Sequence, residues 1–184
     1  MFLELVRRRR SIRRFLDREV EAEKVGLIME AALRAPSSRG LNPWEFIVVT
    51  DRDLLDRLSR SKRHGASFLK NAPLAVVVCA DPDRCDVWIE DASIASIFIH
   101  LAAESLGLGS CWIQIRKRVD EKDNTAEENV SAVLGIPGNL RVESIIAIGY
   151  PGEEKPPHGA EELQHEKVHL NRYGNLYGCR QQDR

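Results

Sequence analysis

The chain has 184 residues, a formal net charge of −1 at pH 7 and a hydrophobic fraction of 43%. A chain of this length can bury a sizeable core, so we expect one domain over residues 1–184 that needs no disulfides. The near-zero net charge gives no overall attraction to nucleic acid or to anionic membranes, and we expect neither as a partner.

The N-terminus and the cysteines favour a cytoplasmic protein. The first residues, MFLELVRRRR, place the charges after a short apolar stretch, which is the reverse of a signal peptide. The longest apolar segment, about residues 94–103, is too short to cross a bilayer. The four cysteines form no C-x-x-C pair, and Cys79 and Cys111 lie in apolar runs typical of buried thiols in a reducing compartment.

Hydrophobic periodicity predicts helices and strands in turn along the first half of the chain. Helical spacing predicts a short first helix that ends in the arginine run at residues 7–10. A second helix is predicted over residues 21–34, and Pro36 stops it. The β-branched residues of 45–50 then predict a strand, and the leucines of 54–58 predict a helix.

The second half continues this mixture. Residues 74–80 form a continuous apolar run, which is typical of a strand buried on both faces. Residues 87–106 predict a helix that is apolar nearly all round, which indicates burial in a core or in a subunit interface. Further short strands are predicted over residues 110–115 and 144–149.

Near the C-terminus, the pattern predicts one more helix and then a polar tail. Thr125 and Glu128 match a capping box, so a helix should start there, and Gly135 should end it. Beyond Pro151 the chain is rich in Pro, Gly and Glu and builds no core by itself. Because strict βαβ alternation is lacking, we expect an α+β domain with helices around a single sheet.

Three segments carry patterns whose chemistry stays open when each is taken alone. Residues 7–15 pack six arginines around Ser11; guanidinium forks suit phosphate and carbonyl acceptors, although a charge run is usually a solvated face. The Ser/Gly loop at 35–46 can bind an anion or simply join a helix to a strand. Gly107 and Gly109 have two possible roles: they could let a flat ligand approach the backbone, or they could end the preceding helix and form a turn. No G-x-G-x-x-G motif supports a Rossmann site.

Together and in this order, the three segments resemble the nitroreductase family, and the resemblance covers nearly the whole chain. The start R-R-S-x-R-x-F matches residues 9–15, and the loop P-S-S-x-x-x-x-P-W matches residues 36–44. The pieces LGLGSCWI, LGIP and IAIGYPGE at 106–113, 134–137 and 146–153 fall where the family has similar ones. The resemblance implies a central mixed, mainly antiparallel sheet and an extended C-terminal tail that contacts a partner subunit.

The resemblance also implies a homodimer with FMN in two sites at the subunit interface. Arg9, Arg10 and Ser11 would hold the phosphate and ribityl chain, and Arg13 would face the pyrimidine edge of the flavin. The other implied contacts are a loop of the second subunit, at Pro36, Ser37, Ser38 and less firmly Asn42, and a segment along the isoalloxazine ring, at Trp112, Ile113 and Gln114.

One stretch departs from the family pattern. Family members often carry Lys or Arg just after the GYP segment to complete the phosphate site. Here the stretch at 153–163 offers only Lys155 and His158 as positive groups. The downstream phosphate contact therefore stays open, with Lys62 and Arg172 as alternatives.

The activity that the resemblance implies is ping-pong hydride transfer from NAD(P)H through FMN to an electron-poor acceptor such as a nitroaromatic, a quinone or a flavin. No side-chain nucleophile or general base is expected. The rival from another class is a non-catalytic FMN carrier or redox sensor. A specialised reaction, such as reductive dehalogenation or dehydrogenation of an amide-like ring, is a third possibility. Residues 116–129 are the only obvious candidate for a substrate lid.

A metal motif near the C-terminus has the wrong context. His165, Glu166 and His169 spell H-E-x-x-H, which on a helix would suit a zinc peptidase. The metzincin continuation needs Gly and His where Arg172 and Asn175 stand, and no Glu follows as a third ligand. We therefore expect no metal site.

A second possible metal pair is His100 with Glu104, spaced i, i+4 on the apolar helix. A histidine on such a face is more often a hydrogen-bonded core residue than a ligand. We expect the core role.

Overall fold

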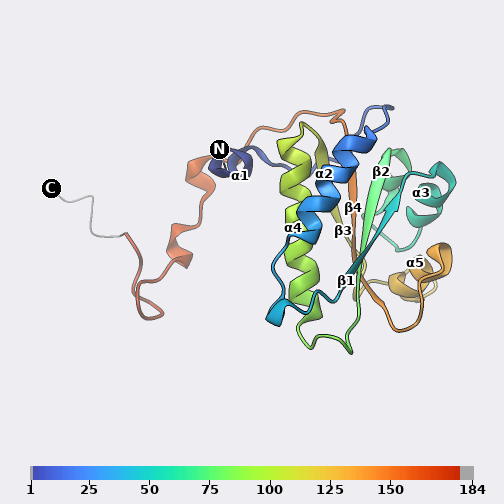
Figure 1. Cartoon of the computed structure of the whole chain (residues 1–184). Coiled ribbons are helices and arrows are strands. Elements are labelled where there is room, and N and C mark those ends of the chain that lie inside the picture. Colours follow the sequence, from blue (N-terminus) through green and yellow to red (C-terminus); the bar gives the residue numbers. More distant parts are fainter. Residues whose placement is uncertain (1, 179–184) are drawn as a thin grey trace.

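A computed structural model describes residues 2–178, and it contains one four-stranded sheet (Figure 1). The strand order is β1-β2-β4-β3, and each neighbouring pair is antiparallel. The strands are β1 (Trp44–Val49), β2 (Leu74–Ala80), β3 (Gly109–Gln114) and β4 (Arg141–Gly149). The predicted mainly antiparallel sheet is confirmed, and the parallel pairing is a single bridge between Ser11 and Ser110 at the β3 edge.

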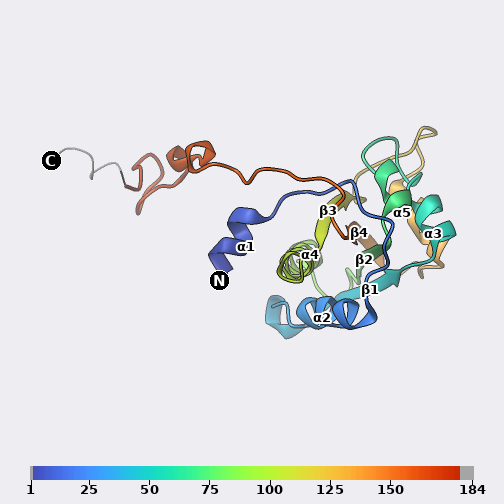
Figure 2. The ribbon, with the colours of Figure 1, turned by 90° about the horizontal axis from the view of Figure 1, so that it is seen from above.

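Helices cover both faces of the sheet (Figure 2). The α-helices are α1 (Phe2–Arg8), α2 (Ala22–Leu33), α3 (Arg52–Leu58), α4 (Trp88–Ser105) and α5 (Ala126–Leu134). Side chains of α2 and α4 pack with Val76 and Val78 of β2, whereas those of α3 and α5 pack with Val77 on the other face. The strand β2 is therefore buried on both faces, which is why its sequence shows no polar alternation.

Helix ends follow the expected local chemistry. Thr125 and Glu128 form the predicted capping box at the start of α5, and Gly135 ends that helix with a φ of 68°. This left-handed conformation favours glycine because a side chain would be strained there. The caps fix where α5 meets the sheet, so the sequence located this helix closely.

The strand β4 is longer than predicted and contains a β-bulge. It starts at Arg141 rather than Ser144, because Arg141 pairs with Ala80 although its surroundings in sequence are polar. A register shift between Val78 and Cys79 leaves Glu143 without a pairing partner on β2. Such a bulge re-aims side chains, and both Glu143 and Ser144 contact serines of α4.

The segment at 116–129, the candidate for a substrate lid, is hydrogen-bonded to the rest of the domain. The carbonyl of Val119 accepts a hydrogen bond from the Arg63 backbone N–H at 3.0 Å. The Asn129 side-chain amide donates to the Ser61 carbonyl and to Asp120, both at 3.0 Å. The segment is therefore fastened to the loop after α3, and its last residues already belong to α5.

The tail after Pro156 runs away from the sheet, past α1 (Figures 1 and 2). It contains two short 3₁₀ turns, Ala160–Glu162 and His165–Lys167. Several of its apolar side chains are exposed: Leu163, Val168, Leu170, Tyr173, Leu176 and Tyr177. Such a row of exposed apolar groups is typical of a segment that packs on another surface.

Two further expectations concern cysteines and membranes. Cys79, Cys85 and Cys111 are buried free thiols, and Cys179 lies outside the described residues. Among residues 2–178, no helix has both the length and the apolar character needed to span a bilayer.

Candidate functional site

The arginine-rich segment at 9–13 lies against the edge strand β3. The backbone N–H of Ile12 donates to the Ser110 carbonyl at 3.0 Å, beside the Ser11–Ser110 bridge. A Cβ atom at Gly109 would lie 2.8 Å from the Ile12 Cβ, so this glycine is what lets the segment approach. The sequence suggested that a flat ligand could approach the backbone at Gly109. In the structure, Ile12 of the same chain makes this close approach. Gly107, with a φ of 75°, lies in the turn after α4.

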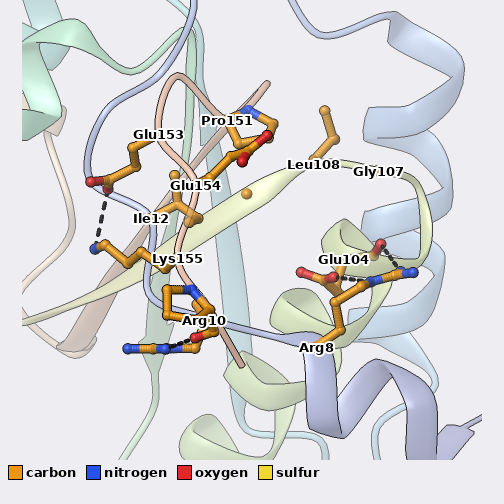
Figure 3. Close-up of a pocket in the computed structure, with 12 residues that line it drawn as sticks. Arg8, Arg10, Ile12, Glu104, Gly107, Leu108, Pro151, Glu153, Glu154 and Lys155 are labelled. Carbon is orange, nitrogen blue, oxygen red and sulfur yellow. Dashed lines mark hydrogen bonds and ion pairs between the residues drawn. The ribbon is translucent and has the colours of Figure 1, made fainter. Parts of the chain in front are cut away.

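The segment after β4 closes over the arginines (Figure 3). The Glu153 carboxylate accepts hydrogen bonds from the backbone N–H groups of Arg13 (2.6 Å) and Arg14 (3.2 Å), and the first of these lowers the pKa of Glu153. Lys155 donates to the Ser11 carbonyl at 2.6 Å and lies 3.2 Å from Glu153. The Arg10 guanidinium donates to the Pro156 carbonyl. These contacts border a cavity of about 830 Å³.

The structure decides which downstream cation joins the arginine segment. Lys155 lies at Ser11, whereas Lys62 donates to the Gln114 carbonyl at the far end of β3, at 2.9 Å. Arg172 lies in the tail, where its backbone N–H bonds the Leu170 carbonyl. His158 contacts Glu162 at 2.9 Å. Of the four possibilities, Lys155 is therefore the one at residues 9–11.

Several positively charged side chains lie near the edge strand β3. Burial raises the pKa of the Cys111 thiol in β3, and nearby positive charges oppose that rise: Arg13, Lys155 and Lys62. Burial and then the charge of Arg118 lower the pKa of Lys62. The Arg13 guanidinium lies 5.9 Å from the centre of the Phe68 ring. A positive strip thus follows β3 from Ser11 to Gln114, and we call it the cationic strip: Arg10, Lys155, Arg13 and Lys62.

Side chains of the predicted ring segment are already engaged within the chain. The Trp112 indole N–H donates to the Gln114 side chain at 2.9 Å, and Ile113 is fully buried. Any ligand along this segment would therefore meet mainly its backbone.

The buried histidine of α4 has a core role, as expected. His100 Nδ1 lies 2.7 Å from the Ser110 hydroxyl, and its ring stacks on Trp112 with centroids 6.4 Å apart. Burial, and then the charge of Arg9, lower the pKa of His100 to about 4. Its predicted neighbour Glu104 pairs instead with Arg8 at 2.7 Å.

The Ser-rich loop lies far from the arginines within one chain. The Ser38 backbone N–H donates to buried Asp91, in the first turn of α4, at 2.8 Å. Arg8 contacts Glu104 in the last turn of the same helix. At 1.5 Å per residue, the two anchor points are about 20 Å apart, at opposite ends of α4 (Figure 1). Within one chain, the loop of Pro36, Ser37, Ser38 and Asn42 is therefore held at the opposite end of α4 from Arg8.

The H-E-x-x-H motif does not form a helical metal face. His165 and Glu166 lie in a three-residue 3₁₀ turn, and His169 pairs with Leu176 in a β-bridge. The His169 ring packs on Tyr173 with centroids 4.5 Å apart. Within residues 2–178, no three His, Cys, Asp or Glu side chains are grouped as a metal site.

Comparison with known proteins identifies the family to which this arrangement belongs. The model of the nitroreductase family matches residues 6–65 and 58–150. The chain belongs to the nitroreductase family. A candidate NADH dehydrogenase/NAD(P)H nitroreductase of Archaeoglobus fulgidus is 38% identical over 176 residues, which cover 93% of this chain and 98% of that protein. One of Methanothermobacter thermautotrophicus is 36% identical, covering 93% and 87%.

A solved structure agrees with the fold of this nitroreductase-family chain. An FMN-dependent nitroreductase from Clostridium difficile superposes with a TM-score of 0.91 at 50% identity, covering 93% of this chain and 99% of that one. The predictions of family, fold class and an oxidoreductase of the FMN and NAD(P)H type are confirmed by these relatives.

The contact between Gly109 and Ile12 generates the first prediction. Gly109→Ala should push residues 9–13 away from β3, lower the free energy of unfolding by about 1–3 kcal/mol and weaken FMN uptake. Gly26→Ala in α2 is the matched control, because nothing lies within 4 Å of its new Cβ. The control should gain up to about 1 kcal/mol. Thermal unfolding and flavin titration measure both effects, and equal behaviour of the two variants would contradict the prediction.

The tail histidines generate the second prediction. His165→Ala and His169→Ala should keep the reductase activity, and chelator treatment should leave it unchanged, because the two imidazoles do not share a helical face. Metal analysis before and after EDTA, together with NAD(P)H oxidation rates, checks this. Stoichiometric zinc that leaves together with the activity would show that the motif is functional.

Proposed function

We propose that the chain is a single FMN-binding domain that works as a homodimer and transfers hydride from NAD(P)H through FMN to a small electron-poor acceptor, such as a nitroaromatic, a quinone or a flavin. The cationic strip beside β3 is the observation that carries the proposal for this chain's own residues. When bound, FMN would supply the hydride relay between the nicotinamide and the acceptor.

The strip fits a ligand with a phosphate at one end and ring acceptors at the other. Arg9, Arg10 and Ser11, with Lys155 beside them, would hold the phosphate and ribityl end, because guanidinium and ammonium groups bind phosphate through charge-assisted hydrogen bonds. Arg13 would face the pyrimidine edge of the ring, where its positive charge favours added negative charge. The backbone of Trp112, Ile113 and Gln114 would lie along the ring.

Two observations support a homodimer. The two residues of α4 that hold Ser38 and Arg8 lie about 20 Å apart by the rise of the helix, so a second chain would bring the loop of Pro36, Ser37, Ser38 and Asn42 to the flavin. In addition, α1, α2 and α4 border an apolar groove of about 590 Å³ whose walls include Phe2, Leu27 and Ile97. Phe2 is 62% exposed and Ile97 is 49% exposed, and a second copy would cover both. The apolar tail would pack on that copy.

The experiment that tests the function starts from the colour of the protein. We expect about one FMN per chain, loss of the yellow colour on anaerobic addition of NADH or NADPH, and its return on addition of a quinone or a nitroaromatic. A protein that takes up no FMN would overturn the proposal. One that binds FMN but is not bleached by either nucleotide would instead be a carrier or a redox sensor.

The roles of two arginines can be separated. Arg13→Ala should lower the flavin potential and slow reduction by NAD(P)H, because a charge-assisted hydrogen bond of roughly 1–3 kcal/mol is lost. Arg13→Lys should be milder, since the charge remains. Arg9→Ala should weaken FMN affinity and leave the reduction rate at saturating FMN nearly unchanged. Flavin titration and stopped-flow reduction measure both quantities, and the reverse pattern would mean that the roles are exchanged.

The oligomeric state gives a further prediction. Ile97→Glu places a carboxylate in the apolar groove and should yield a folded monomer with weak FMN binding, because an unpaired charge is costly to bury between subunits. Val48→Glu on β1 is the control, since Val48 is similarly exposed, at 40%, but lies outside the groove. Light scattering measures the mass, and a monomeric wild-type protein would contradict the prediction.

A further inference from the structure

A positively charged cavity lies beyond the C-terminal end of β3, separate from the cationic strip. Its volume is about 530 Å³, and its wall includes Trp88 and the cations Arg116, Lys117, Arg118 and Arg141. We call it the basic hollow. Glu127 is the one acidic residue among the described residues that line it.

Most of the positive charge of the basic hollow has no acidic partner within the described residues, and Arg141 is the one of its four cations that forms an ion pair. Among residues 2–178, no carboxylate lies within ion-pair distance of the cations at positions 116–118, and Glu127 is 3.8 Å from Arg141. Arg63, close by in the fold, contrasts with them because it pairs with Glu121 at 3.4 Å and with Asp123 at 3.1 Å. The charge of Arg118 also reaches Lys62, whose pKa it lowers in addition to burial. Cations held together in this way favour an anionic ligand.

The hollow also offers an aromatic face. Trp88 is the first residue of α4, and the Arg116 guanidinium lies 5.8 Å from the centre of its ring. Indole rings and guanidinium planes are the surfaces on which nucleic-acid bases stack. An aromatic face beside several unpaired cations is therefore suited to a purine nucleotide that carries phosphates.

The position of the hollow relates it to the ring end of the proposed FMN site. The carbonyl of Glu143 accepts hydrogen bonds from the backbone N–H groups of Ile115 (3.2 Å) and Arg116 (3.1 Å). The Gln114 side chain donates to the Arg116 carbonyl at 3.0 Å. The turn that carries the cations is thus fixed directly to the end of β3 where Lys62 meets Gln114, and Lys155 and Arg10 lie toward the other end.

We propose that the basic hollow binds the adenosine phosphate half of the reduced nicotinamide dinucleotide and that its cations favour NADPH over NADH. The 2′-phosphate, which only NADPH carries, would contact Arg118 and Arg141, and the adenine would stack on Trp88. No bond forms or breaks in the hollow, since the hydride leaves from the nicotinamide. This inference rests on the proposed function for the electron donor and adds a site for its remote half.

The test uses adenosine 2′,5′-bisphosphate, which has no nicotinamide and cannot react. Titration into the FMN-loaded protein by calorimetry and by tryptophan fluorescence should show binding. The variant R116Q/R118Q should weaken that binding at least tenfold, and Trp88→Leu should weaken it and reduce the fluorescence change. Arg141→Gln, on the other wall, is an independent second variant. R57Q/K70Q removes the same amount of charge from exposed positions outside the hollow and should bind like the wild type.

Steady-state kinetics give the second measurement. In R116Q/R118Q, the KM for NADPH should rise about tenfold with kcat nearly unchanged, because the remote contacts are equal in the ground and transition states. The KM for NADH should rise less. If R116Q/R118Q and Arg141→Gln bind the bisphosphate as the control variant does, the hollow is not the site. That result leaves the proposed function intact if NADPH still bleaches the flavin, whereas a failure of FMN uptake overturns the function itself.

Discussion

Strand β3 is the last strand of the sheet, and part of its outer edge is covered by residues 11 and 12. These residues form a bridge and a backbone hydrogen bond with Ser110. That contact needs Gly109, since a side chain there would overlap Ile12. It also orders the segment that carries the arginines, so their guanidinium groups project from a fixed backbone and not from a free N-terminus. Charged groups bind best when their positions are set before the ligand arrives, because less entropy is lost on binding.

The same contact organises the end of the chain. Glu153 accepts the backbone N–H groups of Arg13 and Arg14, and Lys155 donates to the Ser11 carbonyl. Glu153 and Lys155, which follow β4, thereby provide hydrogen-bond partners for backbone groups of the arginine segment that do not pair with the sheet. Lys155, although it is paired with Glu153, adds a positive group beside Ser11, and a phosphate-bearing ligand would complement the cations along β3.

Helix α4 sets the distances on which the proposed site depends. Asp91 in its first turn holds the Ser-rich loop, and Glu104 in its last turn holds Arg8. A rigid helix cannot bring its own ends together, so a site that used both the Ser-rich loop and the arginine segment would need a second chain. Two chains with antiparallel α4 helices would place the loop of one beside the arginine segment of the other, and the exposed apolar face at Ile97 would bury its surface in the same step.

The sequence by itself determined the elements whose pattern is local. The apolar run of β2, the capping box of Thr125 and Glu128 and the all-round apolar character of α4 each predicted an element close to its observed bounds. The short motifs, taken together, also pointed to the family and its flavin chemistry, because glycines, prolines and arginines at fixed spacing reflect local backbone and binding needs.

Only the tertiary structure decided what depends on contacts between distant segments. It selected Lys155 over Lys62 at Ser11, showed that Gly109 makes room for Ile12 and fastened residues 116–129 to the loop after α3. The basic hollow is of the same kind, since its cations come from a turn and from β4. Contacts of this kind join residues that are far apart in the sequence. Their spacing follows neither the helical nor the strand period, so no local pattern in the sequence predicts them.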